Sequence, residues 1–289
     1  MTSVRAVLLA IAAALLYAVS TPVSKLLLGR ISPTMLAGLL YLGAGAGLMF
    51  LKAAITGKDE EGASLARDDM KFVVAMIVLD IAAPVLLLLG LGRTTAANVS
   101  LLNNFEIVMT SVIAFALFGE RISRRLWIGI ALVTLACLAL SVEDASSFSF
   151  SVVSLYVLVA CLCWGLENNC TRRLSARNPM TVTIIKGFGS GLGALCIALV
   201  IGERTCGFLP ALGALGLGFV AYGLSIWFYI RAQRHIGAAR TSAYYALSPF
   251  IGAALSLIAL GEPPTPLFWI ALAIMALGTV VVTQDSLKV

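Results

Sequence analysis

The segment that decides the fold runs from Ala97 to Glu120 and reads ANVSLLNNFEIVMTSVIAFALFGE. It is apolar over a length that can cross a membrane, yet it carries Glu106 near its middle. A second segment, from Ala239 to Glu262, reads ARTSAYYALSPFIGAALSLIALGE. An offset of 142 residues aligns identical residues at Ala97/Ala239, Ser100/Ser242, Gly119/Gly261, Glu120/Glu262 and Trp127/Trp269. The chain therefore reads as two copies of one unit.

Composition indicates a protein of the lipid bilayer. Hydrophobic residues make up 60% of the chain, charged residues only 12%, and the mean hydropathy is +1.01. A soluble domain would carry about 25% charged residues. The apolar runs have the length of about 20 residues that a helix needs to cross a bilayer, and they lack the alternating pattern of a membrane β-barrel. An all-α integral membrane protein follows.

Ten membrane-spanning helices are expected, and the first is expected to be retained as a span and not removed as a signal peptide. Of the 20 Lys and Arg residues, 15 would lie on the side of the N-terminus, four (Lys25, Arg30, Arg93 and Arg204) on the other side, and Lys186 within a span. Positive loops stay in the cytoplasm, so both termini are predicted to be cytoplasmic. The basic residues then hold loops at the inner leaflet, and the net charge of +6 implies no nucleic-acid partner. The expected spans are roughly 4–28, 33–54, 70–92, 94–118, 124–142, 150–170, 180–201, 209–232, 238–260 and 266–284.

An odd number of spans per copy returns the second copy to the membrane upside down. We therefore expect two inverted five-helix repeats, residues 1–142 and 150–289. Inverted repeats are a common construction of secondary transporters, which bind their solute at the interface between the repeats. Channels use such repeats too.

Several motifs resemble one known family over essentially the whole chain. The fourth span of the first copy ends in LFGE (Leu117 to Glu120), and the fourth span of the second copy ends in ALGE (Ala259 to Glu262). In each copy the next span contains Trp. Together with Ala238 to Ser242 and Ser248-Pro249-Phe250, they resemble the EamA-type ten-helix members of the drug/metabolite transporter superfamily. The first copy departs from this pattern, because Glu106 and Ile107 stand where the second has Ser248 and Pro249.

The resemblance implies a transporter that exports amino acids, metabolites or toxic solutes, commonly by exchange or proton coupling. It also implies a central cavity lined mainly by the third, fourth, eighth and ninth spans. The inner membrane is the expected location.

Ionisable residues inside spans point to the same region, because each is costly unless it is paired or hydrated. Asp80 lies in the third span, four residues before Pro84, and Glu106 lies in the fourth. Asn103, Glu106 and Thr110 are spaced to share one helix face, which we expect to line a cavity. In the other copy Tyr245 and Ser248 take the places of Asn103 and Glu106.

Two interpretations stay open for these charges. Glu106 could exchange a proton for solute, with the help of Asp80, or it could simply pair with Lys186 or with Asn and Thr side chains. Asp80 could likewise pair with Lys186. Such a pair would be costly to break, but it need not have a function. Lys186 could alternatively bind a carboxylate of the solute.

Other polar residues are given smaller roles. Glu167 is expected at the membrane interface, while Tyr244 and Tyr245 are placed near the cavity. Glu120 and Glu262 are expected to close tight turns, with Glu262 held by backbone donors of the following turn. The GxxxG spacing of Gly187 with Gly191 and Gly189 with Gly193 predicts close helix packing.

The sequence favours a secondary transporter, and specifically an exporter of a small organic solute such as an amino acid. It contains no phosphate-binding loop for ATP, no metal-ligand spacing and no His-rich site, so no cofactor is expected. A channel or lipid scramblase is the alternative, and an intramembrane enzyme using Asp80 and Glu106 is a third reading. Partners would be the solute, protons and lipid.

Overall fold

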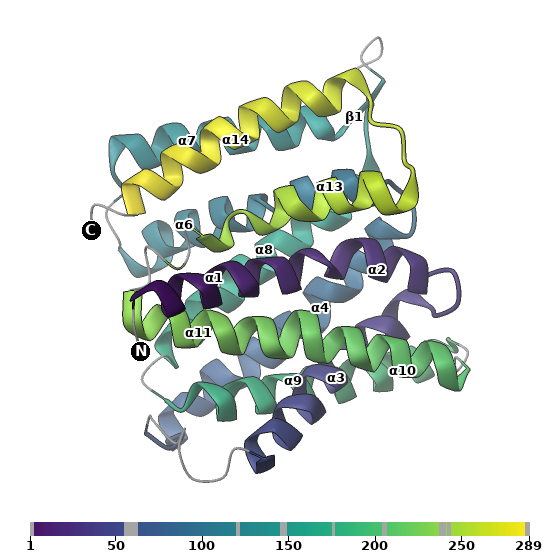
Figure 1. The fold of residues 1–289 in the computed structure, drawn as a ribbon, viewed down its shortest axis with the longest axis vertical. Coiled ribbons are helices and arrows are strands. Elements are labelled where there is room, and N and C mark those ends of the chain that lie inside the picture. Colours follow the sequence, from purple (N-terminus) through teal and green to yellow (C-terminus); the bar gives the residue numbers. More distant parts are fainter. Residues whose placement is uncertain are drawn as a thin grey trace.

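The computed structural model describes residues 3–54, 63–119, 122–144, 149–174, 177–203, 207–236, 241 and 244–286. These residues form a bundle of helices that lie side by side (Figure 1). A two-stranded antiparallel hairpin, β1 (Val142–Asp144) and β2 (Ser149–Phe150), separates the halves of the chain. The first half contains α1 (Ser3–Ala18), α2 (Ser20–Leu27), α3 (Pro33–Ala54), η1 (Arg67–Asp69), α4 (Met70–Leu91), α5 (Ala96–Leu102), α6 (Phe105–Phe118) and α7 (Arg124–Leu140). The second half contains α8 (Val152–Arg173), α9 (Pro179–Val200), α10 (Phe208–Leu217), η2 (Gly218–Leu224), α11 (Ser225–Ile236), α13 (Ser248–Leu260) and α14 (Pro266–Ser286).

Within the described residues, eight helical segments are long and apolar enough to cross a membrane. Two further expected spans are represented by shorter helices: α7 has 17 residues and α13 has 13. The structure thus shows a helical protein suited to crossing a membrane many times. The eight segments are Val4–Leu27, Pro33–Ala54, Arg67–Leu91, Ala96–Leu117, Val152–Arg173, Pro179–Val200, Phe208–Ala232 and Pro266–Gln284.

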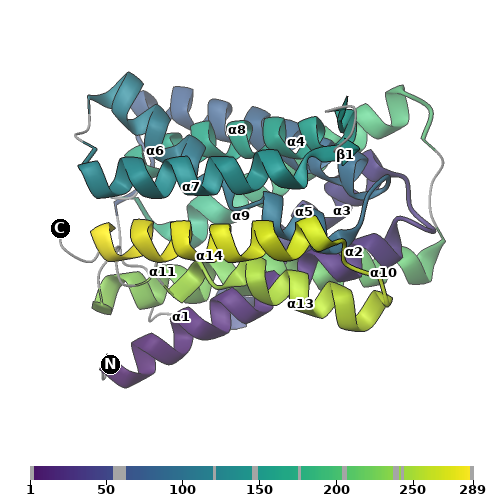
Figure 2. The same ribbon diagram turned by 90° about the horizontal axis from the view of Figure 1, so that it is seen from above.

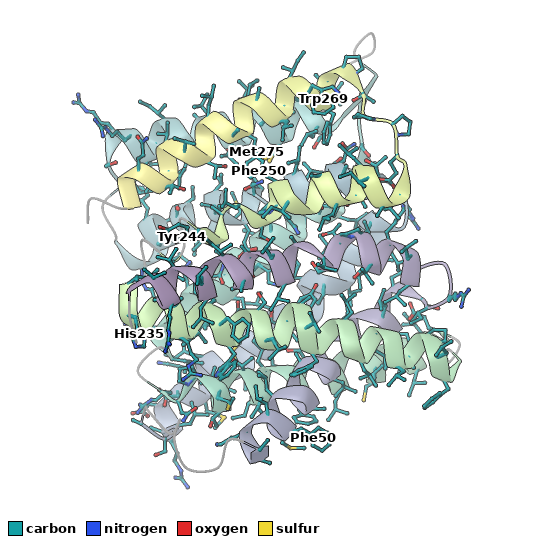
Figure 3. All side chains as sticks on the ribbon, viewed as in Figure 1. Phe50, His235, Tyr244, Phe250, Trp269 and Met275 are labelled. Atoms are coloured by element: carbon teal, nitrogen blue, oxygen red, sulfur yellow. The ribbon has the colours of Figure 1, made fainter. Side chains whose placement is uncertain are left out.

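Both the first and the last helix reach the same end of the bundle. We call this the first end: α1 begins there and α14 ends there in both views (Figures 1 and 2). His235, at the end of α11, also lies there (Figure 3). The opposite, second end carries the turn between α2 and α3 and the β1–β2 hairpin (Figure 1).

The span expected at 94–118 is interrupted in the structure. Helix α5 ends at Leu102, Asn103 and Asn104 form a turn, and α6 begins at Phe105. The second half has a turn at nearly the corresponding place, Ala246 and Leu247, directly before α13. Asn side chains compete for backbone hydrogen bonds and favour such breaks; Nδ2 of Asn104 donates to the carbonyl of Leu101, at 3.1 Å.

Both halves also end this helix in the same way. Gly119 and Gly261 follow α6 and α13 with φ angles of 67° and 63°. A left-handed residue after the last helical residue is a common helix stop, and glycine adopts it without strain. The shared Gly-Glu endings of the sequence therefore have a conformational cause.

Glycines allow α9 to approach its neighbours closely, as the GxxxG spacing predicts. A Cβ on Gly187 would lie 2.5 Å from the backbone nitrogen of Gly45 on α3, and one on Gly191 would lie 3.0 Å from the carbonyl oxygen of Gly38. Gly189 and Gly193 instead face Ile77 and Ile81 of α4. The two glycine pairs thus serve two different neighbouring helices.

Polar contacts between the halves close both ends of the bundle. At the second end, the Glu203 carboxylate accepts hydrogen bonds from the backbone of Thr34 and Met35 (3.3 and 2.8 Å), where α3 begins. Glu262 accepts one from the backbone of Ala96 at 2.8 Å, where α5 begins. The expectation that donors of the following turn hold Glu262 is therefore wrong. Glu120 lies outside the described residues.

The first end is held by an ion pair. Arg177, just before α9, lies 2.8 Å from Asp69 of η1. Beside it the backbone of Ala63 forms a bridge with Arg177, and Asn178 donates to the carbonyl of Ala63 at 3.2 Å. At the first end, both side-chain and backbone contacts thus join the two halves of the chain.

Candidate functional site

Lys186 of α9 lies between two carboxylates that come from two other helices. Its Nζ is 3.0 Å from Oδ2 of Asp80 on α4 and 3.1 Å from Oε1 of Glu167 on α8. Asp80 is fully buried, Glu167 is 2% exposed, and the Lys186 side chain is 14% exposed. Buried charges persist only when they are paired and hydrogen-bonded. We call Asp80, Glu167 and Lys186 the Lys186 cluster.

A neutral hydroxyl also donates to each carboxylate of the cluster. The hydroxyl of Tyr41 on α3 donates to Oδ1 of Asp80 at 2.9 Å. The hydroxyl of Thr171 donates to Oε1 of Glu167 from one turn further along α8. The cluster therefore joins α3, α4, α8 and α9 in one polar contact.

Glu167 was expected at the membrane interface, and the structure buries it among helices, paired with Lys186. It lies on the face of α8 that also buries Val157, Ala160 and Trp164, each three or four residues apart. Extending this spacing by three residues reaches Glu167, so helical periodicity could have identified it. The Asp80–Lys186 pair considered from the sequence is present, and Glu167 is a second acid on the same lysine.

Glu106 has a different environment. Its Oε1 accepts a hydrogen bond from Nδ2 of Asn168 at 2.7 Å, and the same amide lies 3.1 Å from the Thr110 hydroxyl. Nδ2 of Asn169 donates to the backbone carbonyls of Thr110 and Gly165 at 3.1 and 2.8 Å. Glu106 thus binds an amide, as one of the sequence-based alternatives held, and its contact with Thr110 runs through Asn168.

Three consecutive residues of α8 connect these groups. Glu167 contacts the lysine of α9, whereas Asn168 and Asn169 contact α6. Asn103, three residues before Glu106, also faces α8. Its Oδ1 lies 3.8 Å from the thiol of Cys161 on that helix. The shared face predicted for Asn103, Glu106 and Thr110 therefore packs on α8.

Tyrosine rings form a continuous row beside the polar groups. Tyr222 in η2 contacts both Tyr41 and Tyr17, and Tyr17 contacts Tyr245, which in turn contacts Tyr229. The ring centroids lie 5.1 to 5.8 Å apart, within the range of favourable aromatic pairs. The Tyr245 hydroxyl also lies 3.4 Å from the hydroxyl of Ser225. Tyr244 is half-buried and lies toward the first end (Figure 3).

A small cavity lies where the breaks in the two halves meet. Its volume of about 10 Å³ is close to the least that holds one water molecule. Ser100 and Ser248 line it, and their buried hydroxyls have no hydrogen-bond partner among the described residues. The lining residues are Tyr17, Ala18, Thr21, Ser100, Asn103, Ser248, Pro249 and Gly252.

This cavity differs from the one that the family resemblance implies. It is lined by α1, α2, α5 and α13, which correspond to the first, fourth and ninth expected spans. At about 10 Å³ it is too small to hold an organic solute. The larger groove between α3 and the α10–η2 segment is apolar, and Phe50 and Phe219 are among its lining residues. Phe50 is labelled in Figure 3.

Metal-binding clusters are not found among the described residues: no group of three His, Cys, Asp or Glu side chains there could hold a metal ion. The charged groups of the Lys186 cluster are instead paired with one another. Oxygen and nitrogen atoms of this kind suit the binding of a charged or polar solute and the exchange of protons.

Apolar helices that can cross a membrane, with charged groups paired midway along them, define a multi-pass membrane protein with an internal polar site. The model of the EamA-like transporter family matches residues 4–142 and again residues 152–284. The chain belongs to this family, and it is a transporter of the drug/metabolite type.

Similar proteins carry transporter names. An uncharacterized transporter of Methanothermobacter thermautotrophicus is 29% identical over 88% of this chain and 78% of its own length. The inner membrane transporter YedA of Escherichia coli K12 is 22% identical over 87% of this chain and 81% of its own. A solved crystal structure with 17% identity covers 99% of both chains with a TM-score of 0.69, which shows likeness of fold.

Proposed function

We propose that the protein is a secondary active transporter that exports a small organic solute, such as an amino acid or a related metabolite, by alternating access. The observation that carries the proposal is the set of two buried carboxyl groups, the partly buried Glu106 and one lysine inside an apolar helical bundle. Such groups are retained within membrane segments mainly where they serve a pathway for solutes or protons. Exchange or proton coupling would supply the energy.

An inverted repeat of two five-helix units is part of the proposal. The two separate matches of the family model support it, as do the paired helix breaks and the left-handed glycines. The packing also supports it. When a span of one half contacts a span of the other half, the two corresponding spans, each five places away in the chain, are also in contact. Thus α4 packs on α8 as α10–η2–α11 packs on α1, and α6 packs on α8 as α13 packs on α1 and α2.

The site suits a solute with both a positive and a negative group. Lys186 could bind a carboxylate, and Glu106 and Asp80 could bind an ammonium group, as oppositely charged partners do inside proteins. Asn103, Thr110 and Ser248 would add hydrogen bonds, and the tyrosines, with Tyr244 and Tyr245 among them, would cover the apolar part. These contacts would form when the halves move apart and the centre opens.

The proposed location is the inner membrane, with the first end in the cytoplasm. The printed name of YedA supports the location. Basic residues at helix ends support the orientation, because positive residues favour the cytoplasmic side. Those at the first end include Lys52 at the end of α3, Arg124 and Arg125 at the start of α7, and Arg172 and Arg173 at the end of α8.

Two measurements on purified protein test the proposal. A thermal-shift screen against amino acids, nucleotides and cationic dyes should identify a solute that raises the melting temperature. In proteoliposomes, uptake of that solute should saturate, and unlabelled solute inside should accelerate the entry of labelled solute. Flux that neither saturates nor shows this counterflow would indicate a channel or scramblase and refute the proposal.

A further inference from the structure

The Lys186 cluster contains one more acid than base. Asp80 and Glu167 each place an oxygen within 3.1 Å of the same ammonium group. If both carboxyls were ionised, the cluster would carry a net negative charge in a place with almost no access to water. Like charges held close together oppose the ionisation of both, and the usual result is that one of them keeps a proton.

No other described residue is within ion-pair distance of either carboxyl. The titratable groups that face the cluster from neighbouring elements are Tyr41 of α3, Glu106 of α6, Tyr222 of η2 and Cys170 of α8. Each of these is neutral or an acid. Two further cations of α8, Arg172 and Arg173, lie in its last turn and are exposed.

The two carboxyls have matching surroundings. Each contacts the same lysine, and each accepts one hydrogen bond from a neutral hydroxyl, of Tyr41 or of Thr171. The ionised form of each carboxyl is therefore stabilised by the same kinds of donors, and the proton that the excess charge requires has a comparable environment on either one. Matched sites are suited to sharing a proton, as in other carboxylate pairs.

We propose that Asp80 and Glu167 together hold one exchangeable proton beside a permanently charged Lys186, and that this is the proton exchanged during transport. The proposal rests on the proposed transport function and deepens it. When the proton binds, the cluster becomes neutral, and when it leaves, the cluster gains one negative charge. The proton goes to and comes from water on the side to which the site is open.

This proposal gives Glu106 a different part from the one that its position in the sequence suggested. Its partner is the neutral amide of Asn168, which can donate to a carboxylate and, more weakly, to the carbonyl oxygen of a neutral acid. We therefore assign Glu106 to contact with the solute. Glu167, which the sequence placed at the interface, becomes part of the proton site.

Infrared difference spectroscopy of the full-length protein in lipid nanodiscs, recorded against pH, tests this directly. A carboxyl that gains a proton gives a C=O absorption that shifts in D₂O. The wild type should show such a pH-dependent band, and it should disappear in both Asp80→Asn and Glu167→Gln. In each variant the remaining carboxylate forms a simple ion pair with Lys186 and stays ionised.

Glu106→Gln is the matched comparison, because it also removes one acid from the interior of the bundle but should keep the band. The variants Asp80→Glu and Glu167→Asp should keep it too, which separates loss of the acid from loss of folding. A band lost only in Glu106→Gln, lost in only one of the two cluster variants, or absent from the wild type would overturn the proposal. Since the assay needs no solute, its failure is distinct from a failure to transport.

Discussion

At the scale of single residues, Lys186 determines the charge balance of the interior. Its single positive charge is shared by two carboxylates that lie on two different helices. Removing one partner of a buried ion pair leaves an uncompensated charge, which is more destabilising than never having built the pair. The lysine is thus expected to matter for stability as well as for transport.

The substitution Lys186→Met keeps the length of the side chain and removes its charge. We expect it to lower the free energy of unfolding by about 3–5 kcal/mol, the usual result of breaking a buried pair. Denaturant unfolding in detergent micelles measures the change. Lys71→Met, at an exposed position at the start of α4, is the matched control and should change stability by less than about 0.5 kcal/mol. Equal effects would mean that the cluster does not stabilise the fold.

The sequence identified only some of these residues, for a physical reason. Asp80, Glu106 and Lys186 are conspicuous because a charge in an apolar span has few explanations. Tyr41 and Asn168 are ordinary in such spans, and their importance comes from helix rotation, which packing between helices determines. Glu167 was missed because its place near the cytoplasmic end of the expected sixth span outweighed the periodicity of α8.

At the scale of elements, glutamates from the second half bind the first turns of helices in the first half. Glu262 contacts the start of α5 and Glu203 the start of α3. The first backbone N–H groups of a helix have no partner within it, and the helix dipole favours a negative charge there. The acid of the Gly-Glu ending therefore joins two elements, although the sequence suggested a role within its own turn.

Amide hydrogen exchange can distinguish the two contacts. Glu262→Ala should accelerate exchange in α5 by about 2- to 30-fold, because losing a helix cap costs about 0.5–2 kcal/mol. Exchange at the start of α3 should stay as in the wild type. Glu203→Ala should show the reverse pattern, so each variant is the control for the other. Acceleration of both helices in both variants would mean that the second end opens as one unit.

Element boundaries were predictable where the chain has strong signals. Pro33, Pro179 and Pro266 begin helices as expected, and Gly119 and Gly261 follow helix ends. The break at Asn103 and Asn104 was not predicted, because hydrophobicity alone makes 94–118 one continuous span. The π-helical segment η2 likewise has no clear signal in composition.

At the scale of the whole molecule, the described conformation is closed at both ends. Arg177 and Ala63 join the halves at the first end, and Glu203 and Glu262 join them at the second. The central cavity of about 10 Å³ holds no more than about one water molecule. Transport would require each end to open in turn.

A covalent link at the first end tests this requirement. Ala63 and Arg177 are bridged neighbours, so cysteines at both positions are close enough to form a disulfide. In a background without the native cysteines, oxidation of Ala63→Cys/Arg177→Cys should abolish counterflow in proteoliposomes, and a reductant should restore it. Ala63→Cys alone should be insensitive to the oxidant. Unchanged counterflow after complete cross-linking would show that the first end stays closed during transport.

The closed ends also bear on the energy supply of the cell. A membrane that stores energy as a proton gradient tolerates carboxyl groups in its interior only if no continuous file of water connects them to both faces. Contacts at the two ends, and a cavity between the halves with room for only about one water, would oppose such a file in this conformation. If the protein is proton-coupled as proposed, it would remain in the bilayer without dissipating the proton gradient.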